Sequence, residues 1–288
     1  MNPKRALVIS SSTAMQRTAL SHREGGRRIG VVPTMGALHR GHLALISRAR
    51  ELADVVVTTI FVNPLQFGES EDLLRYPRNL EKDVELASDA GTDLVFAPSN
   101  EEVYPAGFST YVEVEGVTGP LEGKSRPGHF RGVTTVVAKL FQITQPHFAV
   151  FGQKDAQQVV VVKKMLRDLE MPVEIVVVPT VREPDGLALS SRNVHLTAQQ
   201  RSEAPILYRA LRLGEQILQD GERNCDAVRG SMRDLIASRS SGSIDYVSIA
   251  DGEELEESVD ARPGHPLLLS LAVRFGTTRL IDNVTVVP

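Results

Sequence analysis

Cysteine is almost absent from this sequence of 288 residues, which contains only Cys225. A single cysteine excludes a disulfide framework, and such a chain is typical of a reducing compartment. Long apolar runs are missing as well, because none approaches the roughly 20 residues that a helix needs to cross a bilayer. We therefore expect a cytoplasmic protein without a membrane span. Charge of one sign is not in large excess either: the net charge is −4 with neutral histidines, which disfavours a nucleic-acid-binding protein.

The composition is that of a globular protein with a packed core. Hydrophobic residues make up 42% of the chain and charged residues 24%, which excludes a disordered or collagen-like protein. At roughly 150 residues per domain, the length predicts about two domains.

The first two thirds of the chain alternate between two kinds of apolar pattern. Continuous apolar runs predict strands buried on both faces, at Ile29–Val32, Val55–Val62, Leu94–Ala97, Phe148–Phe151 and Val173–Val178. Apolar residues at helical spacing follow within 43–52, 80–87, 133–141 and 159–169. Strands that alternate with helices predict an α/β fold with a doubly wound parallel sheet. Whether Ala6–Ile9 forms a further strand stays open.

The pattern changes after Thr180. A polar loop at Arg182–Thr197 precedes two expected helices, Ala198–Leu218 and Asp226–Arg239, and three expected strands, Ile244–Ile249, Leu267–Val273 and Leu280–Val287. The sequence therefore predicts a domain over residues 1–180 and a smaller α+β domain over residues 181–288.

The strongest motif is PTMGALHRGH, Pro33–His42, which follows a predicted strand and opens a helix. Free backbone N–H groups and the positive end of the helix dipole favour a phosphate at such a helix N-terminus. His39 and His42 are three residues apart and can address one ligand together, although two histidines alone do not make a zinc site. The motif predicts nucleotide binding, and the alternative is a pair of ordinary loop histidines.

Two further motifs follow predicted strands. In FVNPLQFG, Asn63 and Gln66 offer neutral amides that can bind hydroxyl and carboxylate oxygens of a small substrate. In FGQKDAQQ, Lys154 suits a phosphate, Asp155 could contact Mg²⁺ or a ribose, and Gln158 lies one helical turn further on. Each motif also has a purely structural explanation. In FVNPLQFG, Asn63 could cap a turn while Gln66 is solvated, and FGQKDAQQ could be an ordinary start of a helix.

Two polar stretches complete the inventory. LSSR, Leu189–Arg192, places two hydroxyls beside a guanidinium and could clamp phosphate, or could be a polar linker. GKSRPGHFRG, Gly123–Gly132, could act as a mobile basic flap or be a solvated basic loop, and it lacks the spacing of a phosphate-binding P-loop. Cys225 has no reactive context, so covalent nucleophilic catalysis has little support.

Taken together, these motifs resemble the pantothenate synthetase (pantoate–β-alanine ligase) family of HIGH-type nucleotidyltransferases. The resemblance also includes YPR at Tyr76–Arg78, RPGHFRGV at Arg126–Val133 and the run VPTVREPDGLALSSRN at Val178–Asn193. It implies an ATP-dependent ligase that condenses pantoate with β-alanine to pantothenate through a pantoyl adenylate, releasing AMP and pyrophosphate. It further implies Mg²⁺, a Rossmann-like domain with a smaller C-terminal lid domain, and a homodimer. The charge balance and the lack of long apolar runs predict no nucleic-acid or membrane partner.

The resemblance also implies roles for matching residues. The ATP site would consist of Met35, Gly36, Ala37, Leu38, His39, Arg40, Gly41, His42, Gly152, Gln153, Lys154, Asp155, Val181, Leu189, Ser190, Ser191 and Arg192. Among these, the catalytic residues would be His42 (the proton donor), His39, Lys154 and Arg192. Gln66 would bind pantoate and β-alanine, Gln158 pantoate, and Asn63 would assist at the same site. Asp155 would contact Mg²⁺ through water.

Three positions depart from the family pattern: Gln153 replaces an acidic residue, Ala156 a larger side chain and Leu189 a methionine. We expect altered affinity rather than lost chemistry. Two rival functions remain, an adenylyltransferase that stops at a nucleotidylated product and a nucleotide-binding regulatory module without turnover.

Overall fold

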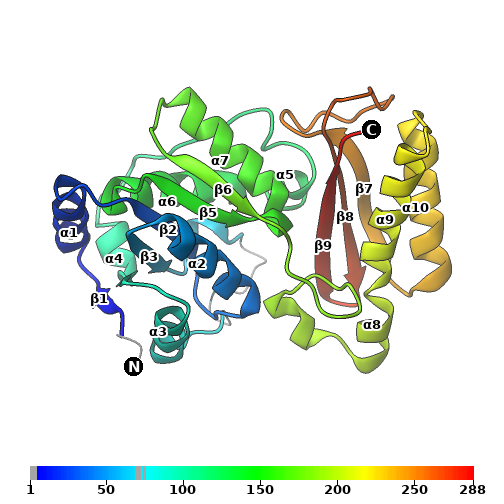
Figure 1. The fold of residues 1–288 in the computed structure, drawn as a ribbon. Helices are drawn as coiled ribbons and strands as arrows, with labels where there is room; N and C mark the ends of the chain where they lie inside the picture. Colours follow the sequence, from blue (N-terminus) through cyan, green and yellow to red (C-terminus); the bar gives the residue numbers. More distant parts are fainter. Residues whose placement is uncertain (1–4, 69–72, 74–75) are drawn as a thin grey trace. The chain divides into compact units, whose positions relative to one another are not determined.

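The computed structural model describes residues 5–68, 73 and 76–288, and the chain forms two compact units. The first unit comprises Met1–Thr118, Glu122–Gly152 and Val161–Pro179. The second comprises Gly119–Leu121, Gln153–Val160 and Thr180–Pro288. Figure 1 shows the chain coloured along the sequence.

The first unit is built on a six-stranded sheet in the order β1-β4-β3-β2-β5-β6, in which every neighbouring pair is parallel. Its strands are β1 (Leu7–Ile9), β2 (Ile29–Thr34), β3 (Val55–Ile60), β4 (Leu94–Phe96), β5 (Phe148–Gly152) and β6 (Glu174–Val178). The five expected strands are all present, and the open question at Ala6–Ile9 is answered by the edge strand β1. The predicted fold class, a doubly wound parallel sheet, is confirmed.

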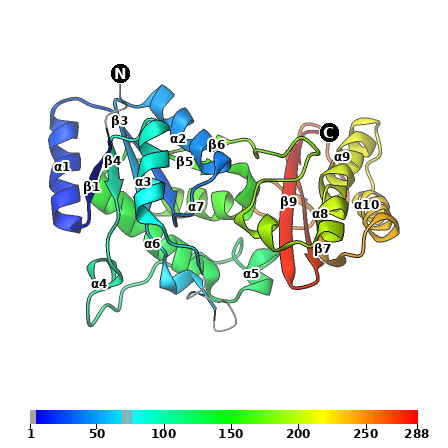
Figure 2. The same ribbon diagram turned by 90° about the horizontal axis from the view of Figure 1, so that it is seen from below.

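Helices cover both faces of this sheet (Figures 1 and 2). The helices that precede β6 are α1 (Ser12–Glu24), α2 (Arg40–Leu52), α3 (Leu80–Asp89), α4 (Asn100–Val103), α5 (Glu122–Ser125), α6 (His129–Thr144) and α7 (Ala156–Asp168), of which α4 and α5 have only four residues each. Helices α2 and α3 contribute Ile46, Ala49, Val84 and Ala87 to a core shared with strand residues such as Val56. The helix α1 was not expected from the sequence, because its polar residues hide a short apolar stripe of Met15 and Ala19.

The second unit contains an antiparallel sheet in the order β7-β8-β9. Its elements are α8 (Ala198–Glu203), α9 (Ile206–Gln219), α10 (Cys225–Arg239), β7 (Ser243–Asp251), β8 (Leu267–Phe275) and β9 (Thr278–Val286). Alternate strand residues share a core with α9 and α10. This core includes Leu211 of α9, Met232 of α10 and Leu269 of β8. The single helix expected over Ala198–Leu218 is wrong: it divides into α8 and α9 at Pro205, which has no N–H to continue the helical hydrogen bonds.

Three motifs follow β2, β3 and β5, which are neighbours in the sheet. Because the strands are parallel, their carboxyl ends lie at one edge, where ligands bind in open α/β sheets. The loops after Thr34 and Ile60 belong to the first unit, whereas the motif after Gly152 continues into the second unit as η3 (Gln153–Asp155).

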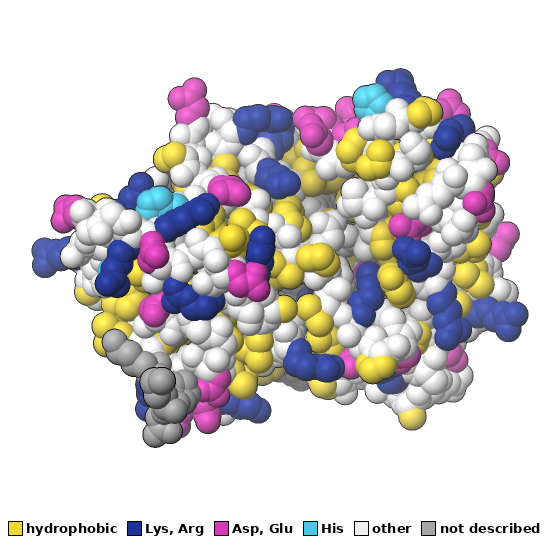
Figure 3. All heavy atoms as spheres, in the orientation of Figure 1, with side chains coloured by type: hydrophobic (Ala, Val, Ile, Leu, Met, Phe, Trp, Pro, Cys, Tyr) yellow, Lys and Arg dark blue, Asp and Glu magenta, His cyan; other side chains and the backbone are white. Residues whose placement is uncertain are grey.

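The described part of the chain has no helix that is both long and apolar enough to cross a bilayer. Figure 3 shows Lys and Arg side chains interspersed with Asp and Glu side chains, so the face drawn has no extended basic patch among the described residues.

Candidate active site

The two histidines of the PTMGALHRGH motif cap the N-terminus of α2. His39 is the N-cap residue, and its Nδ1 accepts a hydrogen bond from the Gly41 N–H at 3.1 Å. In return, the Nδ1 of His42 accepts from the His39 N–H at 3.3 Å, and the ring centroids lie 4.1 Å apart. Since each Nδ1 accepts, the proton of each neutral ring lies on Nε2. The N–H groups of His39 and Gly41 are thus bound by the two rings, and each ring has an Nε2 proton that can bind a ligand.

A buried carboxylate shapes the loop before these histidines. Asp83 on α3, which is 3% exposed, accepts from the N–H groups of Ala37 at 2.9 Å and Leu38 at 2.8 Å. Gly36 has φ +84°, and a Cβ there would lie 2.9 Å from Asp83 Oδ2, so both backbone conformation and space favour glycine. No motif in the sequence indicated Asp83. Its signal was a carboxylate beside the apolar stripe of a predicted helix.

Asn63 is buried and satisfies its hydrogen bonds within the protein. It is 1% exposed, and its Oδ1 accepts from Tyr104 Oη at 2.8 Å and from the Leu65 N–H at 3.3 Å. Its Nδ2 donates to the Gly132 carbonyl at 3.0 Å and to Gln66 Oε1 at 3.1 Å. Burial raises the pKa of Tyr104, which keeps its hydroxyl a donor to Asn63. The geometry gives Asn63 an indirect part: it orients Gln66.

Gln66 ends the short turn η1 (Pro64–Gln66) and is held from two sides. Because its Oε1 accepts from Asn63, the amide presents Nε2 as its donor end away from Asn63. Its backbone carbonyl accepts from His129 Nδ1 at 2.8 Å and from Arg126 at 3.4 Å. The expectation of a basic loop at Gly123–Gly132 is wrong in its structure, because α5 and the start of α6 occupy most of it.

In the second unit, Lys154 and the LSSR segment line one pocket. Its polar lining consists of Lys154, Ser190, Arg192, Asn193, Arg279 and Asp282. Ser190 caps the turn η4 (Ser191–His195) and accepts from the Arg192 N–H at 3.2 Å. Residues far apart in the sequence are thus brought together within this unit. Arg279 was missed, because an arginine in an alternating strand carries no motif signal.

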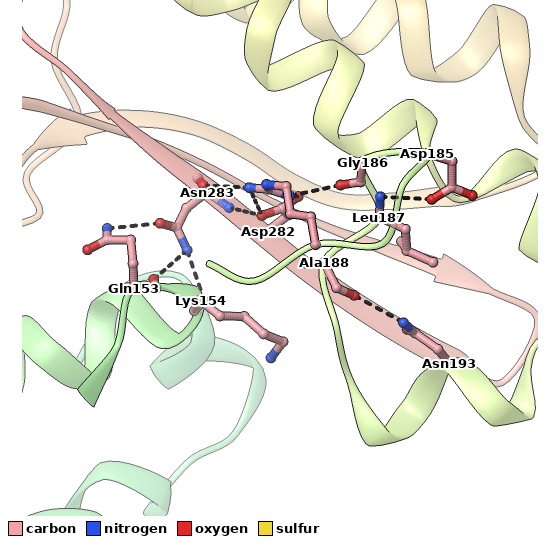
Figure 4. A network of polar contacts seen from close by, with 10 residues as sticks. Gln153, Lys154, Asp185, Gly186, Leu187, Ala188, Asn193, Asp282 and Asn283 are labelled. Carbon is pink, nitrogen blue, oxygen red and sulfur yellow. Dashed lines mark hydrogen bonds and ion pairs between the residues drawn. The ribbon is translucent and has the colours of Figure 1, made fainter. Parts of the chain in front are cut away.

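A polar network supports this pocket (Figure 4). Arg182 forms a bidentate pair with Asp282 at 2.6 and 2.9 Å and lies 3.8 Å above the Tyr208 ring. Burial raises the pKa of the Asp282 carboxyl, and the pair with Arg182 opposes that shift. The Val181 carbonyl accepts from the Leu189 N–H at 2.9 Å. The loop from Val181 to Leu189 is therefore closed on itself and presents Ser190 at its end.

Three further predicted residues lie between the end of β5 and the first turn of α7. Gly152 ends β5, Gln158 lies half-buried in the first turn of α7, and the half-exposed Asp155 contacts Lys154 Nζ at 3.4 Å. Among the described residues, no three His, Cys, Asp or Glu side chains are grouped to hold a metal ion. A cation at Asp155 would therefore need further ligands from a nucleotide. Cys225 is buried, and burial raises the pKa of its thiol.

A doubly wound sheet with a histidine-capped helix at its carboxyl edge, together with a pocket lined by cations, defines a nucleotide-binding enzyme of the α/β class. Comparison with known proteins gives the particular family. The model of the family "Pantoate-beta-alanine ligase" matches residues 7–285, and the chain belongs to this family. The predicted resemblance and the ligase activity are confirmed.

Relatives match over nearly the full length. The pantothenate synthetase of Moorella thermoacetica is 55% identical over 279 residues, which cover 96% of this chain and 97% of the relative. That of Acetivibrio thermocellus is 53% identical, with 97% and 99% covered.

Two solved structures are similar as well. Pantothenate synthetase from Thermus thermophilus has a TM-score of 0.90 at 47% identity, covering 98% of this chain and all of its own. The pantoate-beta-alanine ligase from Francisella tularensis, complexed with "Beta-gamma ATP" and β-alanine, has a TM-score of 0.78 at 34% identity and covers 97% of each chain.

Proposed function

We propose that the chain uses ATP to convert pantoate to pantoyl adenylate and then transfers the pantoyl group to β-alanine, forming pantothenate. One observation carries the proposal: the histidine-capped helix and the oriented amide of Gln66 follow neighbouring strands at the same edge of one sheet. This arrangement supports a nucleotide site beside an amide donor for a small acid. The similar Francisella structure, with an ATP compound and β-alanine bound, supports the same pair of ligands.

The reaction needs activation because a carboxylate is a poor acyl donor. The pantoate carboxylate attacks the α-phosphorus of ATP and releases pyrophosphate. The neutral amine of β-alanine then attacks the pantoyl carbonyl and releases AMP. The protein aligns two anions that repel each other and stabilises the charge that develops on the phosphates.

The phosphate donors come from both units. In the first unit, His39 and His42 offer their Nε2 protons, and His42 serves as the proton donor. In the second, Lys154, Ser190 and Arg192 line one pocket and, with Ser191, hold the leaving phosphates.

The amides address the small acid. Gln66 donates from Nε2 to pantoate and borders β-alanine, and Gln158 binds pantoate. Asn63 acts through Gln66, since its own hydrogen bonds are satisfied within the protein. Neutral amides suit this task because they bind oxygen atoms without reacting with the acyl adenylate.

The chemistry of the residues fits a Mg²⁺ ion that is held mainly by nucleotide phosphates. Mg²⁺ keeps several waters and is bound through one or two carboxylates plus substrate phosphates, and Asp155 is the half-exposed carboxylate beside Lys154. When bound, the ion spreads the charge of the leaving pyrophosphate. We further propose that the protein works in the cytoplasm as a homodimer and that residues 181–288 act as a lid.

Exchange of labelled pyrophosphate into ATP tests the function most directly. We expect exchange that depends on pantoate and proceeds without β-alanine, and release of AMP only when the amine is added. Exchange without amine-dependent release of AMP would favour an adenylyltransferase. Stoichiometric binding of ATP without pyrophosphate release, under any carboxylate, would favour a regulatory module.

A further inference from the structure

Strand β9 presents two adjacent side chains, Asp282 and Asn283, to opposite faces of the small sheet (Figure 4). Asp282 shares the face of the core residues Leu280 and Val286, where it pairs with Arg182. Asn283 points to the other face and contacts the η3 turn. We propose that Asn283 is a positioning residue that fixes Lys154 in the phosphate pocket. This inference rests on the proposed function, which assigns Lys154 to the phosphates.

The contacts of Asn283 leave it a single orientation. Its Nδ2 donates one hydrogen bond to the Gln153 carbonyl at 3.0 Å and another to the Lys154 carbonyl at 2.9 Å. Its Oδ1 accepts from Gln153 Nε2 at 3.0 Å. Both amide hydrogens therefore bind consecutive carbonyls, and Asn283 as a residue is only 4% exposed. Rotating the amide by half a turn would set its oxygen against two carbonyl oxygens.

These bonds matter because a three-residue 3₁₀ turn has little internal bonding of its own. Lys154 sits in the middle of η3, so the position of its backbone decides where Nζ can reach. Anchoring the turn to the centre of a nine-residue strand replaces this missing rigidity.

The neighbouring residue Asp282 supports the other wall of the pocket through Arg182. Asp282 holds Arg182, which also donates to the Gly186 carbonyl at 3.1 Å in the loop that leads to Ser190. Two adjacent residues of one strand thus tie both phosphate-handling segments of the second unit. The spacing between Lys154 and Ser190 is set by the strand rather than by the loops themselves.

The alternative to a positioning role is a purely structural one, in which Asn283 makes the same contacts but affects only the stability of the fold. A double-mutant comparison separates the two roles. We expect Asn283→Ala to lower pantoate-dependent pyrophosphate–ATP exchange by about 10- to 100-fold, since a misplacement of 1 Å in such a site costs on the order of 100-fold. In a Lys154→Ala background, the same change should lower exchange no further, because Asn283 acts through Lys154.

Thermal unfolding measured on each variant gives the folded fraction, by which every rate is corrected. Ser270→Ala is the matched control. Ser270 lies opposite Asn283 on β8, is 5% exposed, and its Oγ has no hydrogen-bond partner in the described part of the chain. We expect Ser270→Ala to exchange at the parental rate. Asn283→Ser, which can still donate one hydrogen bond, should lose less than Asn283→Ala and serves as the second variant if the latter unfolds.

The outcomes are distinct. Parental exchange by folded Asn283→Ala or, where that variant unfolds, by folded Asn283→Ser would overturn the positioning role and leave the proposed function intact. An equal loss in the wild-type and Lys154→Ala backgrounds would show an effect on stability or on another group, and would overturn it too. Absence of exchange in the parental protein would instead overturn the proposed function.

Discussion

The imidazole of His42 has two separate tasks at the start of α2. Its Nδ1 accepts the His39 N–H at 3.3 Å, and its Nε2 proton is proposed to reach the nucleotide. His39 is arranged in the same way, because its Nδ1 accepts from the Gly41 N–H at 3.1 Å. If His42 also donates the proposed proton, variants that keep the helix cap and variants that lose it should differ in stability but not in activity.

We expect His42→Ala to lower pyrophosphate–ATP exchange by about 100- to 1,000-fold, the usual effect of removing one well-placed donor. The loss of the cap should cost only about 0.5–2 kcal/mol of stability. His42→Asn keeps an acceptor near the His39 N–H and should restore stability without restoring exchange. His265→Ala, which changes an exposed histidine, is the control. Exchange by His42→Ala at the parental rate would remove His42 from the mechanism.

Gln153 gives a residue-scale test of the departure from the family pattern. Its Nε2 donates to Asn283 Oδ1 at 3.0 Å, and Asn283 cannot rotate because its own NH₂ binds two carbonyls. Gln153→Glu should therefore place a carboxylate oxygen against Asn283 Oδ1. We expect this repulsion to lower the free energy of unfolding by about 1–3 kcal/mol at neutral pH.

The sign with pH follows from the same contact. When protonated, the carboxyl introduced by Gln153→Glu can donate to Asn283 Oδ1, whereas its ionised form cannot, so the pKa of the new carboxyl should be raised. The stability deficit of Gln153→Glu should shrink as the pH falls toward about 4, near the usual pKa of a glutamate, in urea unfolding at several pH values. A deficit that stays constant over the same range would contradict this account.

At the scale of elements, η1 and α6 approach so closely that they fix Gln66. Gly132 in α6 leaves room for the Leu65 carbonyl, from which an added Cβ would be only 2.2 Å away. The same helix supplies His129, which donates to the Gln66 carbonyl. The segment Gly123–Gly132, for which the charges allowed a basic flap, therefore contains residues that hold Gln66 in place.

We expect Gly132→Ala to destabilise the protein by about 1–3 kcal/mol or more, because the backbone of η1 must move. The same displacement should raise the KM for pantoate. Gly230→Ala is the matched control: Gly230 lies within α10, nothing lies within 4 Å of its added Cβ, and alanine should stabilise that helix by roughly 0.5–1 kcal/mol. Thermal unfolding and steady-state kinetics measure both effects, and a neutral Gly132→Ala would contradict the packing described.

At the scale of the whole molecule, His147 links the stability of the sheet to pH. It precedes β5, and its Nδ1 accepts from the Ile29 N–H of β2 at 2.9 Å. Burial, followed by the nearby charges of Arg23 and Arg28, lowers the pKa of His147. A histidine whose pKa is lowered by folding stabilises the fold in its neutral form, above its usual value of about 6.5, and this contribution is lost as the pH falls through the lowered pKa.

We therefore expect the free energy of unfolding to decrease more steeply between about pH 7 and pH 5 in the parental protein than in His147→Gln. The glutamine can accept from the Ile29 N–H but does not titrate. Urea unfolding at several pH values measures the difference. Equal pH slopes in the two proteins would show that His147 does not carry this dependence.

The sequence by itself determined the strands of the parallel sheet, because short runs rich in β-branched residues, such as Val55–Val62, are typical of strands covered on both faces. It also determined the family, since PTMGALHRGH, FVNPLQFG and the LSSR segment occur together in order. It did not determine a helix across Pro205, where one missing N–H outweighed the apolar periodicity.

Only the tertiary structure decided which side chains support others. Asp83 binds the N–H of Ala37, and Asn283 binds the carbonyl of Lys154, through hydrogen bonds between residues that are distant in the chain. A motif shows residues that lie close together in sequence. Buried polar groups find partners wherever the packed core brings a donor to an acceptor, and that pairing is set by the fold.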